Sequence, residues 1–220
     1  GRPSSASHPK ADRRASSELG ESVERLVKSG LRLNGQPTEA ALHETLIEEV
    51  AELLGARRAL LVLEDAGGSR VAGAQLPDGE DAAALLAAIG PWVDEARTLR
   101  SSRLRHGPDG ADPIDQRSCI VAPLLVNREL LGVLYADLEG LFGRFRESDH
   151  HLLATLAAQA AVALANLRTQ EGLERQVAER TAALEQRAGE LALINSIQQG
   201  MSAKLDFQGI VDLVGDKLRE

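Results

Sequence analysis

The sequence has little of what several classes of protein require. It holds a single cysteine, Cys119, so no disulfide can form within the chain, and a reducing compartment is expected. No run reaches the roughly 18 consecutive apolar residues that would span a bilayer. Residues 1–17 are polar and Ser-rich, without the apolar stretch of a secretory signal. We therefore expect a cytoplasmic protein without membrane insertion, preceded by a disordered lead or linker over residues 1–17.

Aromatic residues and net positive charge are also scarce. The chain of 220 residues has one Trp, one Tyr and three Phe, which disfavours large planar ligands because few rings are present to stack on them. The 33 acidic residues outnumber the 25 basic ones and give a net charge of -8. Such a chain is repelled by phosphate backbones, so nucleic acid is not an expected partner.

Apolar periodicity predicts the secondary structure of the first half. Helices are expected over 18–33 and 39–54, where apolar residues recur at three- and four-residue spacing. The run ALLVL at 59–63 predicts a buried strand, with 70–75 as its hairpin partner.

Glycine and proline residues indicate where the elements in the middle of the chain begin and end. Gly90-Pro91 is expected to separate a short helix at 81–89 from a second one at 92–99. Residues 101–117, rich in Gly, Pro, Asp and Arg, predict a mobile loop.

Two apolar strands are expected over 118–126 and 130–136. Asn127-Arg128 would be the central pair of their hairpin, with positive φ if the turn is type I′. Both strands are apolar at nearly every position, which predicts a sheet covered on both faces and a helix, sheet, helix layering.

A long helix is expected to begin near Ser148-Asp149 and to carry an unbroken heptad frame. No other predicted element would cover Val177, Leu184 and Leu191, so we expect this helix to bury them by pairing with a second copy of the chain. The alternative is a single solvated helix, because the seam is weak in its middle. The expected homodimer seam consists of Leu153, Leu156, Ala160, Ala163, Leu167, Val177, Leu184, Leu191 and Asn195.

The end of the chain repeats its start. Ile210 to Val214 echoes Leu46 to Val50, and a turn is expected at 202–206. Residues 201–220 are therefore predicted to begin a second copy of the first domain, with residues 169–200 as the connecting coiled coil.

Two segments, VAPLLVNRELLGVLYADL and FRESDHHLLATLAAQAAVALANL, resemble the GAF family of small sensory domains, and the resemblance extends over residues 18–168. The segment LERQVAERTAALEQRAGELALINSIQQG looks like the signalling helices of bacterial histidine kinases and nucleotide cyclases. The resemblance implies an α+β fold, with a five- or six-stranded antiparallel sheet, helices on both faces and a ligand pocket. It also implies a parallel homodimer formed through the terminal helices.

Five residues are candidates for lining the pocket. Cys119 is either a redox sensor or a small core residue, and Asp137 either meets a ligand or caps the turn that follows it. Arg97, Arg103 and His106 either face an anionic ligand or belong to a solvated helix end and loop.

The sequence requires no cofactor, metal or catalytic group. The family's cyclic-nucleotide motif is not found, and its reductase members need several cysteines. His150 and His151 are adjacent, so on a helix they diverge by about 100° and are not expected to chelate one metal together. We predict a non-enzymatic, regulatory GAF domain that senses a small molecule and relays the signal through a parallel coiled coil. The alternatives are a ligand-free dimerisation module and a small redox enzyme on the same fold.

Overall fold

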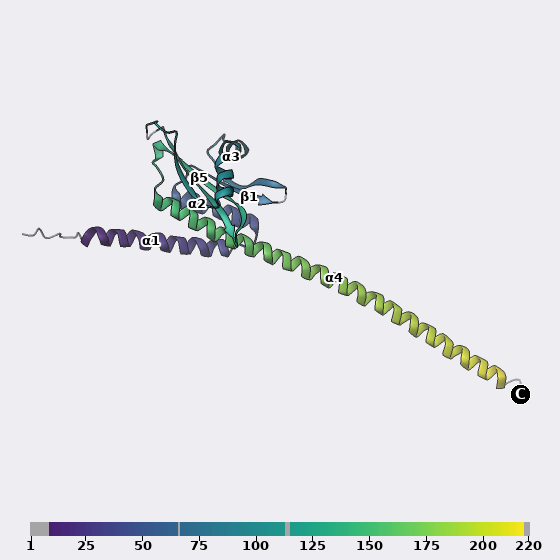
Figure 1. Cartoon of the computed structure of the whole chain (residues 1–220). Helices are drawn as coiled ribbons and strands as arrows, with labels where there is room; N and C mark the ends of the chain where they lie inside the picture. Colours follow the sequence, from purple (N-terminus) through teal and green to yellow (C-terminus); the bar gives the residue numbers. More distant parts are fainter. Residues whose placement is uncertain (1–8, 66, 113–114, 218–220) are drawn as a thin grey trace, which may run out of the picture. The chain divides into compact units, whose positions relative to one another are not determined.

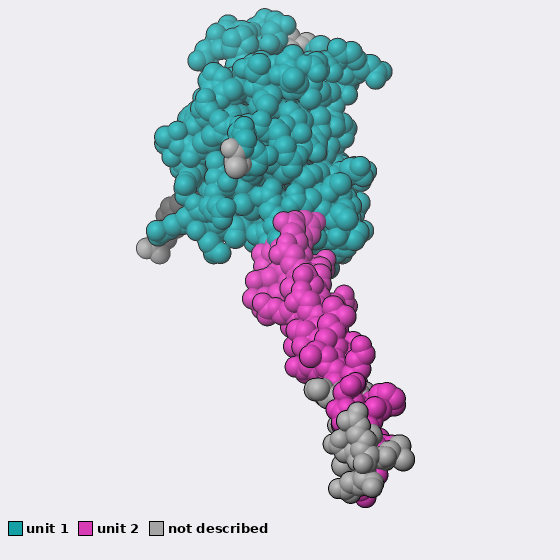
Figure 2. Space-filling model, turned by 90° about the vertical axis from the view of Figure 1, so that its right-hand side faces the viewer, with its two compact units in different colours: residues 1–168 teal, residues 169–220 magenta. Residues whose placement is uncertain are grey.

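The computed structural model describes residues 9–65, 67–112 and 115–217. The chain forms two compact units, residues 1–168 and residues 169–220 (Figure 2). The elements follow in the order α1 (Pro9–Asn34), α2 (Glu39–Leu54), β1 (Arg58–Asp65), β2 (Gly68–Gln75), α3 (Ala82–Leu99), β3 (Arg103–Gly107), β4 (Arg117–Val126), β5 (Glu129–Glu139), a 3-10 turn (Gly140–Phe142) and α4 (Glu147–Lys217).

The first unit is built on a five-stranded antiparallel sheet in the order β2-β1-β5-β4-β3. Its long central hairpin turns at Asn127 and Arg128, whose φ angles of 50° and 70° confirm the predicted positive-φ turn. β4 and β5 are buried along most of their length, as predicted from their continuous apolar runs.

Helices cover both faces of the sheet, which confirms the predicted three layers (Figure 1). On one face α1, α2 and the first part of α4 form the larger core, with Leu46, Leu134 and Leu156 among its fully buried members. On the other face α3 alone packs on the sheet, through Leu85, Ile89 and other buried residues.

Local signals fix the ends of α2. The Thr38 hydroxyl accepts a hydrogen bond from the Ala41 backbone N–H at 3.2 Å, which caps the start of the helix. Gly55 follows the last turn with φ of 60°, the left-handed conformation that glycine adopts without strain. These signals explain why the predicted bounds of α2 are confirmed.

Side chains lock α4 to the two helices beside it. The Gln159 side-chain amide donates to the Leu26 carbonyl at 3.3 Å, and Gly30 faces Gln159 so closely that a Cβ there would lie 2.9 Å from its nitrogen. The Arg168 guanidinium pairs with Glu39 at the start of α2, at 2.9 Å. The last turn of α4 within the first unit is thus tied to the domain.

Two predictions for the middle of the chain are wrong. Residues 82–99 form one helix with Pro91 inside it, because the stripe of Leu85, Ile89, Val93 and Ala96 buries continuously against the sheet and outweighs one lost hydrogen bond. The predicted loop over 101–117 contains strand β3, which pairs only with β4. As a largely polar edge strand, β3 has no apolar pattern to reveal it.

The terminal helices are longer than predicted. α1 begins at Pro9, so residues 9–17 are helical, and residues 1–8 lie outside the described residues. α4 continues through 202–206 to Lys217, so the turn predicted there is absent. No Gly or Pro interrupts SAKLD at 202–206, and local helix propensity continues the helix.

α4 is also long and apolar enough over one window to pass a composition test for a membrane-spanning helix. Of that window, 39% is buried inside the protein. The core helix of a folded domain can pass the same test, and Leu153 and Leu164 in the first part of α4 are buried against the sheet.

Candidate functional site

A hollow of about 330 Å³ lies between α3 and the sheet. This volume is at the small end of the range for ligand pockets in proteins. α3 contributes its first turns and Trp92, and the strands contribute the charged ends of β1 and β4. The lining residues are Arg58, Glu80, Asp81, Ala84, Leu85, Ala88, Ile89, Trp92, Arg117 and Tyr135.

The floor of this hollow is organised by Asp137, which is fully buried near the end of β5. Its carboxylate accepts hydrogen bonds from Arg58 Nε at 2.8 Å, from Arg117 at 3.2 Å and from the Tyr135 hydroxyl at 2.5 Å. Its backbone carbonyl accepts the Arg57 N–H at 2.8 Å. One carboxylate therefore holds three of the residues that line the hollow.

Strand register explains why these groups meet. Arg58 at the start of β1 is opposite Asp137 on β5, and Arg117 at the start of β4 is opposite Glu139, two residues further along. Residues two apart on a strand share a face, so both guanidinium groups reach the same carboxylate. Two arginines therefore meet one aspartate where the three inner strands β1, β5 and β4 lie side by side.

The outer ends of both arginines are also paired. Arg58 bonds Glu80 at 3.0 Å, and Arg117 bonds Glu139 at 2.6 Å. Charge-assisted contacts of this kind hold the guanidinium planes in fixed orientations. An incoming anion would have to displace Glu80 or Glu139 to reach them.

Burial and charge shift the pKa values of the groups around this floor. Burial, aided by the Asp137 charge, raises the pKa of Tyr135 above its usual range. Its hydroxyl therefore stays protonated and donates a hydrogen bond to Asp137. Burial also raises the pKa of the Cys119 thiol to about 12, with a smaller contribution from Asp137. Burial alone would lower the pKa of Arg58, but its hydrogen bonds to Asp137 outweigh this effect and raise it.

The apolar wall of the hollow comes from α3. Ala84 and Ala88 are one helical turn apart on the face toward the hollow, and their short side chains leave space above the strands. Trp92 offers the only indole in the chain. The hollow thus combines an apolar wall with a charged rim and a hydrogen-bonded floor.

Comparison with known proteins identifies the architecture around this hollow. A family model described as GAF domain matches residues 39–164, more than half of the chain. The chain belongs to the GAF family. This match confirms the resemblance drawn from the β4–β5 hairpin and the start of α4.

Solved GAF domains share the fold at low sequence identity. The GAF domain of a protein described as a sensor histidine kinase from Pseudomonas syringae pv. tomato has a TM-score of 0.54 at 16% identity, covering 75% of this chain and 99% of that one. A methyl-accepting chemotaxis protein, residues 122 to 287, gives 0.53 at 17% identity, covering 64% and 98%. A GAF domain from an Acinetobacter phosphoenolpyruvate-protein phosphotransferase gives 0.50 at 14% identity, covering 67% and 94%. No match was found among curated proteins.

None of the five predicted pocket residues of this GAF domain is among the residues that line the hollow. Asp137 is fully buried and bonds three residues that do line it, Arg58, Arg117 and Tyr135. Cys119 lies beside it, opposite Asp137 in the strand register, but is buried in the core under α3. Arg97 pairs with Glu64 at 2.7 Å on the rim of β1. His106 bonds the buried Ser118 hydroxyl at 2.8 Å. Arg103 is about half exposed and has Glu95 at 3.9 Å.

The lining residues that sequence reasoning missed are the strand-terminal arginines Arg58 and Arg117, together with Tyr135 and Trp92. A signal for the two arginines was present in the sequence. Each arginine directly precedes a continuous apolar run, and a charged residue at the end of a buried strand needs a partner. What the sequence did not reveal is the register that brings both arginines to Asp137.

The structure also buries four of the nine predicted seam residues inside the GAF domain. Leu153, Leu156, Ala160 and Ala163 are at most 2% exposed and pack in the domain's own core. Leu167 is partly buried against the same core. These residues face the sheet, so they are not available to a second copy, and the heptad frame was extended too far toward the start of α4.

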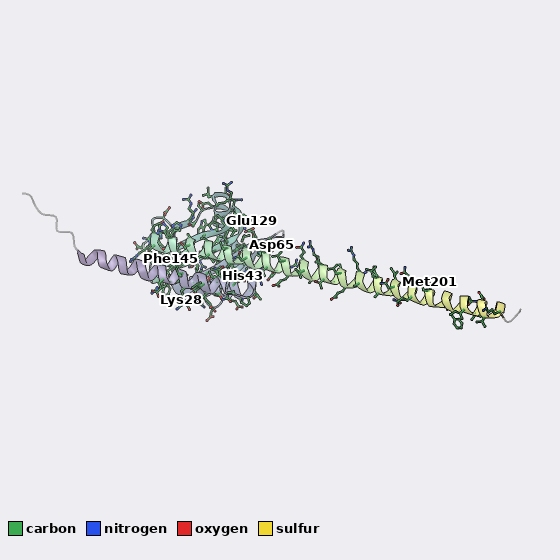
Figure 3. The ribbon with its side chains drawn as sticks, turned by 90° about the horizontal axis from the view of Figure 1, so that it is seen from below. Lys28, His43, Asp65, Glu129, Phe145 and Met201 are labelled. Carbon is green, nitrogen blue, oxygen red and sulfur yellow. The ribbon has the colours of Figure 1, made fainter. Side chains whose placement is uncertain are left out.

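After residue 168 the predicted seam residues are exposed instead of buried. Val177, Leu184 and Leu191 are 60–65% exposed, and Asn195 is exposed as well. Figure 3 shows Met201 and other side chains projecting from this part of α4. Within the first unit a second exposed apolar row lies on α1, at Val23, Val27 and Leu31.

Proposed function

We propose that this chain is the sensing part of a dimeric, cytoplasmic bacterial signalling protein. A small molecule binds in the hollow between α3 and the sheet. Binding shifts the packing of α4 on the domain, and the shift passes along a parallel coiled coil formed by residues 169–217. The receiver is an output domain of the histidine kinase or nucleotide cyclase type.

The observation that supports this proposal is that α4 has a first part buried in the domain core and a second part with exposed apolar side chains. Its first five turns supply buried residues such as Leu156 and Leu164 to the GAF core. Its continuation bears a row of exposed large apolar side chains, Val177, Leu184 and Leu191. Because one continuous helix contains both parts, a displacement of the core residues would be passed on to the exposed row.

A parallel homodimer gives these apolar rows a partner. The seam we now propose starts after Leu167 and keeps Val177, Leu184, Leu191 and Asn195. In this frame Arg180 at position g faces Glu185 at the following e position of the partner, an attractive pair in a parallel dimer. The exposed row of Val23, Val27 and Leu31 on α1 supports further contact between the two domains.

The hollow supports a small ligand with at least one anionic group. Arg58 and Arg117 are the only cationic groups among its lining residues within the described chain, and Trp92 with Leu85 supplies apolar contact. A carboxylate or phosphate on the ligand would replace Glu80 or Glu139 on the outer ends of the arginines.

A ligand-free dimerisation module is the second candidate function. The specific observation in its favour is that both arginines are fully paired by Asp137, Glu80 and Glu139. A redox enzyme is not supported, because Cys119 is buried and its raised pKa keeps the thiol protonated at neutral pH.

Mass spectrometry of the purified native chain distinguishes the sensor from the scaffold. We expect a small molecule to be released on denaturation, and to be lost when Ala88→Phe fills the hollow. Ala83→Phe is the matched control, since Ala83 is an exposed residue of the same helix that does not line the hollow. A native mass equal to that of the protein alone would favour the ligand-free module.

A further inference from the structure

A cluster of potential metal ligands lies at the first turn of α4, away from the hollow under α3. Glu147, His150 and His151 each offer one ligand atom, and these atoms all lie within 4.8 Å of one another. His150 Nδ1 is 2.8 Å from Glu147 Oε1, and His151 Nε2 is 3.4 Å from the same oxygen. It is the only such group among the residues that the structure describes.

Helix geometry produces this cluster. His150 and His151 point about 100° apart around the axis, which is why the sequence analysis expected no shared metal. Side chains on a helix lean toward its N-terminus, however, so residues three and four positions on both reach back over Glu147. The two rings stack with centroids 5.7 Å apart and an angle of 22° between their planes.

A second observation concerns the far side of the His150 ring. Its Nε2 lies 2.7 Å from the hydroxyl of Ser102, in the segment between α3 and β3. Histidines that bind metals through one nitrogen commonly donate the other N–H to an oxygen, which fixes the tautomer and the ring orientation. In the tautomer that donates Nε2–H to Ser102, Nδ1 carries a lone pair for the cation, which would lie between this nitrogen and the Glu147 oxygen.

We propose that Glu147, His150 and His151 form a binding site for one divalent transition-metal cation of the Zn²⁺ type. Two imidazoles and a carboxylate suit Zn²⁺, Ni²⁺ and Cu²⁺, whereas Mg²⁺ and Ca²⁺ prefer oxygen ligands alone. Ligands at about 2.0–2.1 Å from a tetrahedral ion lie roughly 3.3–3.4 Å from one another. The separations of 2.8 and 3.4 Å bracket this value, and the side chains of Glu147 and His151, 66% and 74% exposed, are free to adjust.

The site would act on the start of the helix that leaves the domain. The cation links the first turn of α4 to the segment before β3 through His150 and Ser102. Its fourth coordination position faces solvent, because Glu147 and His151 are exposed. The inference does not depend on the hollow or on the proposed dimer.

Calorimetric titration of the untagged full chain with Zn²⁺ tests the site. One ion is expected per chain, with affinity that falls as the pH is lowered, because imidazole ligands must be deprotonated. Glu147→Gln and His151→Ala are expected to abolish binding. Ser102→Ala, which removes only the supporting hydroxyl, should weaken it by about 10- to 100-fold. Mg²⁺ should give no heat of binding.

His106→Gln is the matched control, because it removes an exposed histidine outside the cluster and should leave Zn²⁺ binding unchanged. Equal binding by wild type, Glu147→Gln and His151→Ala would overturn the proposal and leave an adventitious ion only. Absence of Zn²⁺ binding by the wild-type chain would also overturn it. Both ligand variants change exposed side chains, so their far-ultraviolet circular dichroism should match that of the wild type.

Discussion

Replacing Asp137 by alanine is expected to lower the free energy of unfolding by about 3–5 kcal/mol. The carboxylate is fully buried and accepts hydrogen bonds from Arg58, Arg117 and Tyr135. Its removal takes the shared buried acceptor from two guanidinium groups and a phenol hydroxyl. Glu80 and Glu139 still pair with the outer ends of the arginines, but the buried donors that faced Asp137 lose their hydrogen bonds, which is costly. Urea unfolding at one fixed protein concentration measures the change.

Asp65→Ala is the matched control for this prediction. Asp65 also pairs with an arginine, Arg70 at 3.3 Å, but both side chains are about half exposed. Exposed ion pairs contribute roughly 0–1 kcal/mol, so this variant should stay within about 1 kcal/mol of the wild type. Similar unfolding free energies for Asp137→Ala and Asp65→Ala would show that Asp137 does not organise the floor of the hollow.

Replacing both Leu184 and Leu191 by aspartate is expected to convert a dimer into a monomer. Burial of one leucine side chain contributes about 1.5–3 kcal/mol, and the dimer would bury four of them, so the loss amounts to roughly 6 kcal/mol or more. Light scattering at micromolar concentration should report twice the chain mass of 23.5 kDa for the wild type and 23.5 kDa for the double variant.

Leu193→Asp provides the matched control for the seam. Leu193 is 62% exposed, similar to Leu184 and Leu191, but it falls at position f of the heptad frame and faces away from the partner. This variant should remain dimeric. A monomeric wild type, or dissociation by Leu193→Asp to the same extent, would contradict the proposed seam.

Elements with strong local signals were predicted closely from sequence: the bounds of α2 to the residue, and those of the β4–β5 hairpin to within three residues. α2 has a capping threonine and a left-handed glycine, and the hairpin of β4 and β5 has two apolar runs around Asn127-Arg128. β3 was missed because an edge strand needs no apolar pattern. α3 was divided at Pro91 because tertiary burial, which sequence does not display, compensates for the lost hydrogen bond.

The candidate site was less predictable than the fold. Asp137 was singled out because a carboxylate at the end of an apolar strand stands out, but it does not line the hollow itself and is linked to it through Arg58, Arg117 and Tyr135. Arg58 and Arg117 were not, because their relation to Asp137 depends on pairing between strands that are distant in sequence. Arg97, Arg103 and His106 form a basic run in sequence, but the structure directs them to Glu64, Glu95 and Ser118.

The heptad frame illustrates the same limit on α4. A period of three and four residues marks any helix face that becomes buried, whether in the domain's own core or against a second chain. Leu153 and Leu156 satisfy the pattern through the sheet, whereas Leu184 and Leu191 remain exposed. Only the position of the sheet shows which apolar residues of α4 belong to the domain's own core and which remain exposed.

Disulfide cross-linking through cysteine at position 184 tests the central claim most directly. In a parallel, in-register dimer the two copies of residue 184 face each other at position d, close enough for a disulfide. Leu184→Cys should therefore form a covalent dimer under mild oxidation, while Leu193→Cys should not, and the buried Cys119 should take no part. A chain that stays monomeric with Leu184→Cys, or cross-links equally well with Leu193→Cys, would contradict the parallel coiled coil.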